Sequence, residues 1–128
     1  MKKFFWLMLG VLLTSGAFAQ QEALKVKEFK KEIKKKEAIV LDVRTPEEFA
    51  DGHIRNATNA DWKNPEEFKI KISQLPRTEP VYVYCRSGVR SEKASEWLRA
   101  NGFTQVSGLD GGIEAWKKAG KRVSKAKQ

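Results

Sequence analysis

The sequence predicts an α/β fold with a mainly parallel central sheet of about five strands and helices on both faces. Two runs of strand length, residues 38–43 and 80–85, are almost wholly apolar instead of alternating with polar residues. Such runs are typical of parallel strands that are buried on both faces. Segments with helical character separate the expected strands along the whole chain. This alternation favours crossover connections and therefore a parallel sheet.

Strands and helices are expected in turn. The strands are expected at residues 23–26, 38–43, 56–61, 80–85 and 105–107. The helices are expected at residues 27–36, 64–76, 91–100 and 112–119, and a short helix is expected to begin at Pro46. Pro46 and Pro65 fit the first turns of two helices, where a missing N–H removes no hydrogen bond, and Asn64 fits the cap before the second. Gly102 and Gly120 fit the ends of the last two helices.

A signal peptide is expected over residues 1–19. Two lysines follow the initiator methionine, an apolar run comes next, and the small residues Ala17 and Ala19 close the segment. The run is too short to span a bilayer as a mature helix, and the order of regions is that of a signal peptide. We therefore expect export, to the periplasm or the medium, of a chain that begins at Gln20 and is not stably inserted in a membrane. A retained anchor is the alternative, and residues 20–128 are expected to form one domain.

The charge balance is basic, with 25 Lys and Arg against 16 Asp and Glu and a net charge of +9. The basic residues concentrate at 25–36 and 117–127, on or beside expected helices, where such runs usually form solvated faces. Attraction to anionic substrates or acidic surfaces is the alternative. Because no nucleic-acid-binding motif accompanies the charge, no nucleic-acid partner is expected. The domain is expected to be a monomer.

Cys85 is the only cysteine, so no disulfide can form within the chain. An unpaired thiol in an exported protein is either reactive or buried and inert. Cys85 ends the second apolar strand, and ligands of parallel sheets bind outside the carboxyl ends of the strands. One cysteine and one histidine, His53, do not make a zinc site. Neither a metal nor another cofactor is expected.

The loop after Cys85 has the composition of an anion-binding cradle. It contains Arg86, Ser87, Gly88, Val89, Arg90 and Ser91. A short loop between a strand and a helix can direct several N–H groups at one point, and glycine permits the positive φ that such a loop often requires. The helix N-terminus and the two arginines add positive charge. These groups are expected to keep Cys85 as a thiolate near neutral pH and to bind an anionic substrate, with Ser91 capping the helix and hydrogen bonding to the loop or thiolate.

Two other interpretations of this loop are weaker. The first is an inert cysteine before an ordinary polar turn, which does not explain two arginines, a serine and a glycine in so short a stretch. The second is a cysteine phosphatase. Its signature has one residue more between Cys and Arg than the four residues found from Cys85 to Arg90. The smaller cradle suits a bare sulfur better than a tetrahedral phosphate.

Three motifs resemble those of rhodanese domains. They are the block 41–49 with 52–54 and 56–59, the loop 83–91, and the closing segment 106–120. Together they cover about residues 23–123 in the family's order. Asn56 stands where the family usually has glycine, and Asp61-Trp62 replaces a more apolar stretch. The chain is therefore similar to single-domain rhodaneses, and the resemblance implies their fold and chemistry.

The resemblance implies sulfur transfer through a cysteine persulfide. The Cys85 thiolate would attack the outer sulfur of a donor such as thiosulfate and release sulfite. The persulfide would then pass its outer sulfur to cyanide or to a thiol, small or on a protein, with no metal or organic cofactor. Arg86, directly after the nucleophile, resembles the thiosulfate-using members of the family. Arg90 ends the loop, where it is expected either to bind the same anion or to brace the loop from outside. A non-enzymatic persulfide carrier or partner-binding module is the alternative.

Asp42, Arg44 and His53 are expected to be structural residues near the site. Asp42 and Arg44 flank a strand end and are expected to anchor neighbouring loops, with direct substrate contact as the alternative. His53, in Gly-His-Ile, resembles a structural histidine of the family, and a catalytic Cys–His pair is the alternative.

Overall fold

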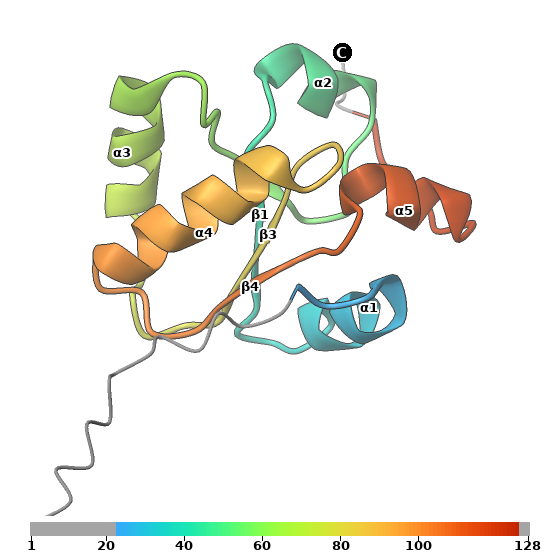
Figure 1. Cartoon of the computed structure of the whole chain (residues 1–128), viewed down its shortest axis with the longest axis horizontal. Coiled ribbons are helices and arrows are strands. Elements are labelled where there is room, and N and C mark those ends of the chain that lie inside the picture. The colour runs from blue at the N-terminus through green and yellow to red at the C-terminus, as the bar shows by residue number, and fades with distance from the viewer. Residues whose placement is uncertain (1–22, 126–128) are drawn as a thin grey trace, which may run out of the picture.

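A parallel β-sheet lies at the centre of the fold (Figure 1). The computed structural model describes residues 23–125, and the expected signal peptide and the Gln20 terminus lie outside them. Within this range the sheet has the strand order β2-β1-β3-β4, and all three pairings are parallel. The strands are β1 (Ile39–Asp42), β2 (Thr58–Asn59), β3 (Val81–Tyr84) and β4 (Val106–Gly108). The helices are α1 (Val26–Ile33), α2 (Pro46–Asp51), α3 (Pro65–Ser73), α4 (Val89–Ala100) and α5 (Gly112–Lys118).

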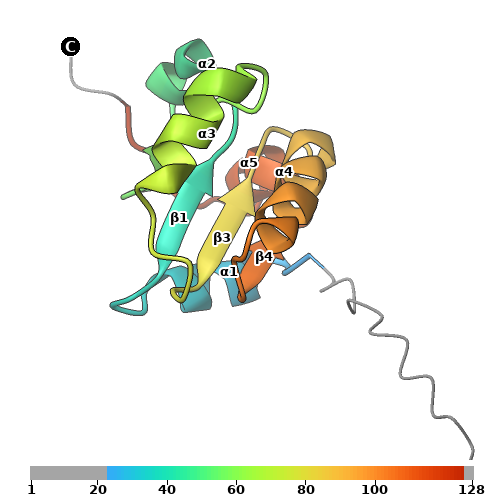
Figure 2. The same cartoon turned by 90° about the vertical axis from the view of Figure 1, so that its left-hand side faces the viewer.

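Helices cover both faces of the sheet, as the sequence predicts. Figure 2 shows α3 and α4 in front of the sheet and α1 and α5 behind it. Each face has its own cluster of buried side chains. Leu41 and Val83 pack toward α3 and α4, whereas Val40 and Tyr84 pack toward α1 and α5. Both central strands are therefore buried on two faces, which explains their continuous apolar sequence.

The expected edge strand at 23–26 is wrong, and the described sheet has four strands where about five were expected. Leu24 forms only an isolated parallel bridge with Leu109. The chain enters α1 at Val26, and the amide of Phe29 already donates to the carbonyl of Lys25. The helix thus starts one residue earlier than expected, and its Phe29 side chain is completely buried.

Two helix starts follow the local signals. Thr45 and Glu48 form a reciprocal capping box before Pro46, and the Asn64 side chain accepts from the Glu67 amide before the next helix. The following helix, α4, begins at Val89, two residues earlier than expected. Within residues 23–125, no helix is both long and apolar enough to cross a membrane.

Candidate active site

Cys85 lies directly after β3, at the carboxyl end of the sheet, and is almost fully buried. Its carbonyl accepts from the Ile113 amide at 2.9 Å, and the carbonyl of Arg86 accepts from the Glu114 amide at 3.1 Å. The first turn of α5 therefore holds the start of the loop in place. Gly112 makes this approach possible, because a Cβ there would lie 2.6 Å from the Cys85 carbonyl oxygen.

The sulfur of Cys85 lies inside its own loop. The amide of Gly88 donates to Cys85 Sγ at 3.0 Å, and Sγ lies 3.3 Å from Ser91 Oγ. Gly88 has φ +124°, a conformation that favours glycine, and it is the N-cap residue of α4. The positive end of α4 is therefore close to the sulfur, and both features stabilise a negative charge there.

Ser91 does not cap α4, contrary to expectation. The helix begins at Val89 with Gly88 as its cap, so Ser91 already lies in the first turn. Its hydroxyl donates to the Gly88 carbonyl at 3.1 Å. Ser91 thus connects the sulfur with the loop backbone, which is the contact that the sequence predicted.

Arg90 is held by a carboxylate that the sequence did not identify. Its guanidinium binds both oxygens of Glu48, at 2.6 and 2.9 Å. Arg90 lowers the pKa of Glu48 from 4.5 to about 2. The hydrogen bonds to Glu48 in turn raise the pKa of Arg90. Glu48 also forms the capping box with Thr45, and the Thr45-x-x-Glu48 spacing was the only signal in the sequence that singled out this glutamate.

The Arg86 side chain forms an ion pair with a residue of α5. Its Nε donates to Glu114 Oε1 at 2.7 Å, and its side chain is 68% exposed. Ser87 and Val89 lie at the rim of the loop, with the Val89 side chain largely exposed. Neither Ser87 nor Val89 forms a hydrogen bond with the sulfur, whose partners are Gly88 and Ser91.

Asp42 and Arg44 form a buried ion pair beside the end of β1. Arg44 Nη2 lies 2.8 Å from Asp42 Oδ2 and donates to the Gly52 carbonyl at 2.6 Å. The Asn59 side chain donates to the carbonyls of both Asp42 and Arg44. These contacts connect β1, β2 and the end of α2, as expected of anchoring residues. Neither side chain forms a hydrogen bond with Cys85.

His53 lies at the end of α2 and not beside the sulfur. Its ring stacks on Phe49 with 3.8 Å between centroids, and Nδ1 lies 2.9 Å from the Phe49 carbonyl oxygen. Its backbone pairs with Ser124. Among the described residues, no group of three or more His, Cys, Asp or Glu side chains has the arrangement of a metal site.

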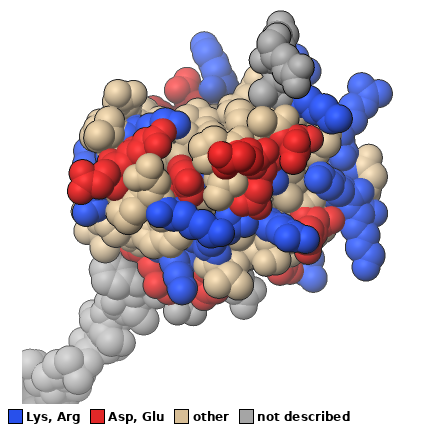
Figure 3. Space-filling model, turned by 90° about the horizontal axis from the view of Figure 1, so that it is seen from above, with Lys and Arg blue, Asp and Glu red and all other residues tan. Residues whose placement is uncertain are grey.

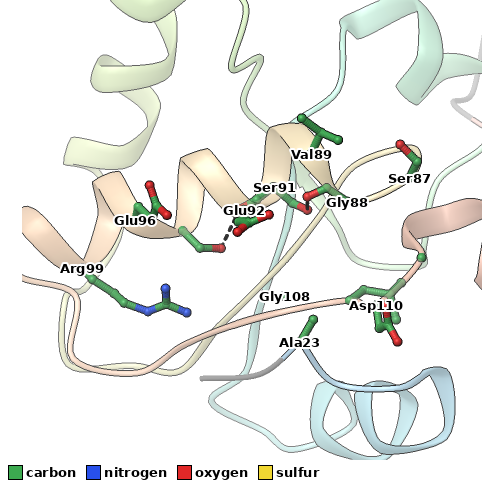
Figure 4. A pocket seen from close by; sticks show the side chains of 13 residues that line it. Ala23, Ser87, Gly88, Val89, Ser91, Glu92, Glu96, Arg99, Gly108 and Asp110 are labelled. Carbon is green, nitrogen blue, oxygen red and sulfur yellow. Dashed lines mark hydrogen bonds between the residues drawn. The ribbon is translucent and has the colours of Figure 1, made fainter. Parts of the chain in front are cut away.

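A groove of about 540 Å³ runs from the loop along α4 (Figure 4). Ser87, Gly88 and Ser91 line the end nearest the loop, and Arg99 lies at the other end. Three carboxylates line the groove between α4 and the segment that follows β4, namely Glu92, Glu96 and Asp110. The groove is therefore more acidic than the basic composition of the chain suggests.

Comparison with known proteins finds relatives among sulfurtransferases and tRNA hydroxylases. A thiosulfate sulfurtransferase of Arabidopsis thaliana is 40% identical over 89 residues, which are 62% of this chain and 74% of that protein. A sulfurtransferase of Allochromatium vinosum is 37% identical over 84 residues, 66% of this chain and 76% of that protein. A tRNA uridine(34) hydroxylase of Pelagibacter ubique is 39% identical over 87 residues, 68% of this chain.

The chain spans only part of several relatives: 29% of that hydroxylase and 62% of a Bacillus subtilis protein of uncharacterized function. Among solved structures, a rhodanese-related protein of Thermoplasma volcanium is 31% identical, with a TM-score of 0.70 over 80% of this chain and 97% of the other. The model of the rhodanese-like domain matches residues 25–119. With the sulfurtransferases among its relatives, the chain belongs to the rhodanese-like domain family.

Proposed function

We propose that the protein is a sulfurtransferase that carries sulfur as a persulfide on Cys85, with thiosulfate or a similar anion as donor. The observation that carries this proposal is the hydrogen bond of 3.0 Å from the Gly88 amide to Cys85 Sγ at the positive end of α4. A thiolate in this position is stabilised by groups that are already in place, so the nucleophile needs no metal.

In the first step, the Cys85 thiolate attacks the outer sulfur of thiosulfate. A bond forms between the two sulfurs, the bond within thiosulfate breaks, and its electron pair leaves with sulfite. In the second step, a nucleophile such as cyanide or a thiolate attacks the outer sulfur of the persulfide. The Cys85 thiolate then leaves with its electron pair, so that the enzyme is regenerated without net oxidation.

The two arginines of the loop have different functions in this proposal. Arg90 is partly buried in its bidentate pair with Glu48, so it positions the first turn of α4. The pair of Arg86 with Glu114 is mostly exposed, and exposed pairs contribute little stability, about 0–1 kcal/mol. Breaking the ion pair with Glu114 therefore costs little free energy, and Arg86 can then bind an anionic sulfur donor instead.

The groove favours a second candidate, transfer to a protein acceptor. Thiosulfate is small, and the carboxylates Glu92, Glu96 and Asp110 would repel it along most of the groove. A cationic segment of an acceptor protein would instead be complementary to them. Figure 3 shows that carboxylates are interleaved with basic groups over the α2 end of the molecule. The protein would then deliver its persulfide to a partner, with or without catalytic turnover.

We also propose export, since a charged start, an apolar run and Ala17-x-Ala19 occur in order before the domain. N-terminal sequencing of the protein from its native cells should give Gln20 as the first residue. An intact Met1 on a cytosolic species would contradict this.

Steady-state assays test the sulfur chemistry. With thiosulfate and cyanide, the protein should form sulfite and thiocyanate in equal amounts, and Cys85→Ser should form neither. Phosphate esters should be turned over far more slowly, because the loop is one residue shorter than the phosphatase signature. Faster phosphatase than sulfurtransferase activity would show that the loop binds a different anion.

A further inference from the structure

A second hollow lies on the opposite face of the sheet from α3 and α4. It has a volume of about 710 Å³ and lies between the end of α1, the loop at Arg55 and the segment after α5. Its apolar lining includes Val40, Ile54 and Trp116, which belong to the cluster packed against α1 and α5. The hollow is therefore separate from the loop of Cys85 and from the groove along α4.

The lining of this hollow is strongly basic and contains no carboxylate. One lysine, Lys35, forms an ion pair with Glu32 at 2.7 Å. The other cations have no carboxylate partner within residues 23–125. They are Lys30, Lys34, Lys36, Arg55, Lys121 and Arg122.

These cations come from three separate segments of the chain, and the fold brings them together. The positive charge of Lys121, followed by that of Lys34, lowers the pKa of Lys30. The positive charges of this cluster therefore repel one another. Figure 3 shows that basic side chains gather on the α5 side of the molecule. An anion with several charges in the hollow would relieve this repulsion.

We propose that this hollow, which we call the α1–α5 pocket, binds a small ligand that carries two or more phosphate groups. Its volume lies in the range of about 300–1,000 Å³ that is typical of small-molecule sites, and a nucleic-acid duplex would not fit inside it. Lysines bind phosphate as point charges, and Arg55 and Arg122 supply forked donors that match two phosphate oxygens. A small ligand with two or more linked phosphates can contact several of these unpaired cations at the same time.

Calorimetric titration with inorganic tripolyphosphate at near-physiological salt tests the proposal. The variant Lys34→Gln/Lys121→Gln/Arg122→Gln should bind at least about tenfold more weakly than the parent, since charged hydrogen bonds are lost. The matched control Lys63→Gln/Lys69→Gln/Lys93→Gln removes the same charge from exposed lysines outside the pocket. The control should change affinity less than about twofold, and orthophosphate should bind the parent much more weakly than tripolyphosphate.

An NMR titration reports binding at the pocket itself, separately from a general attraction of the anion to the positively charged protein. Trp116 lines the pocket, and its indole N–H donates to the Arg122 carbonyl at 2.8 Å. Its signal should shift on addition of tripolyphosphate. The indole signals of Trp62 and Trp97, which pack on the other face of the sheet, should not shift.

Three binding results would overturn the proposal: no binding of tripolyphosphate by the parent, equal weakening in both triple variants, or binding only to vesicles that contain phosphatidylglycerol. The last result would assign the cations to a membrane surface instead of a pocket. Sulfur loading of Cys85 in the pocket variant should equal that of the parent, and its loss would contradict a separate site. The phosphate titration does not depend on sulfur transfer, so failure of either proposal can be recognised on its own.

Discussion

Replacement of Glu48 by Gln should remove an acid-sensitive contribution to stability. The folded-state pKa of Glu48 is about 2, against an ordinary value of 4.5, chiefly because Arg90 binds both of its oxygens. A difference of that size corresponds to about 3 kcal/mol. Because the Glu48 side chain is 29% exposed, solvent screening reduces our expectation to about 1–2 kcal/mol at pH 7.

The pH dependence follows from the direction of the shift. A carboxylate whose pKa is lowered on folding contributes stability that is complete above its unfolded value and is lost as pH falls through the folded value. The parent should therefore be more stable than Glu48→Gln at pH 7, and this advantage should shrink between about pH 4.5 and pH 2.

Urea denaturation at pH 7, 5 and 3 measures this difference in the free energy of unfolding. Glu47→Gln is the matched control, since Glu47 lies in the same helical turn, is exposed and forms no ion pair within the described residues. It should change stability little at any of these pH values. A difference between parent and Glu48→Gln that stays constant from pH 7 to pH 3 would show that the Arg90 pair does not set the pKa of Glu48.

Three further substitutions test how the loop is built. In Gly88→Ala the new Cβ meets no atom within 4 Å, but the φ of +124° is strained for alanine, so the free energy of unfolding should fall by about 1–3 kcal/mol. The strain should also move the amide from Cys85 Sγ, and stopped-flow measurements should show slower sulfur loading. Gly112→Ala places a Cβ against the Arg86 and Cys85 carbonyls, so urea denaturation should show a loss of about 1–3 kcal/mol; a stability like the parent's would contradict the close approach. Arg86→Ala should lower kcat/KM for thiosulfate about tenfold to a hundredfold through KM, since a charged hydrogen bond contributes about 1.5–3 kcal/mol. Unchanged kinetics would leave recognition to the backbone amides.

The sequence was sufficient for the central strands and the position of Cys85. Residues 38–43 and 80–85 are apolar because both faces of β1 and β3 are covered, and that pattern is visible without a structure. The edge segment at 23–26 was also expected to be a strand, yet it forms only the isolated bridge of Leu24 with Leu109, and Val26 already belongs to α1. Only tertiary packing decides between these two outcomes.

The partners of the loop could not be predicted in the same way. Arg86 and Arg90 were both expected to add positive charge near the sulfur, with bracing of the loop as the alternative for Arg90. Their carboxylate partners were not predicted, because Glu114 and Glu48 lie far away in the chain. A pairing of this kind depends on how α2, α4 and α5 meet above the sheet. The same holds for Gly112, whose close approach to the loop carbonyls is a property of the packed structure and not of its local sequence.

Intact-mass measurement after incubation with thiosulfate tests the central claim most directly. The parent should gain the mass of one sulfur atom, and cyanide should remove it and release thiocyanate. Peptide mapping should place the added sulfur on Cys85, and Cys85→Ser should gain nothing. A parent protein that keeps its original mass with thiosulfate and with other sulfane donors, while its Cys85 thiol is still alkylated by iodoacetamide, would contradict a persulfide on this cysteine.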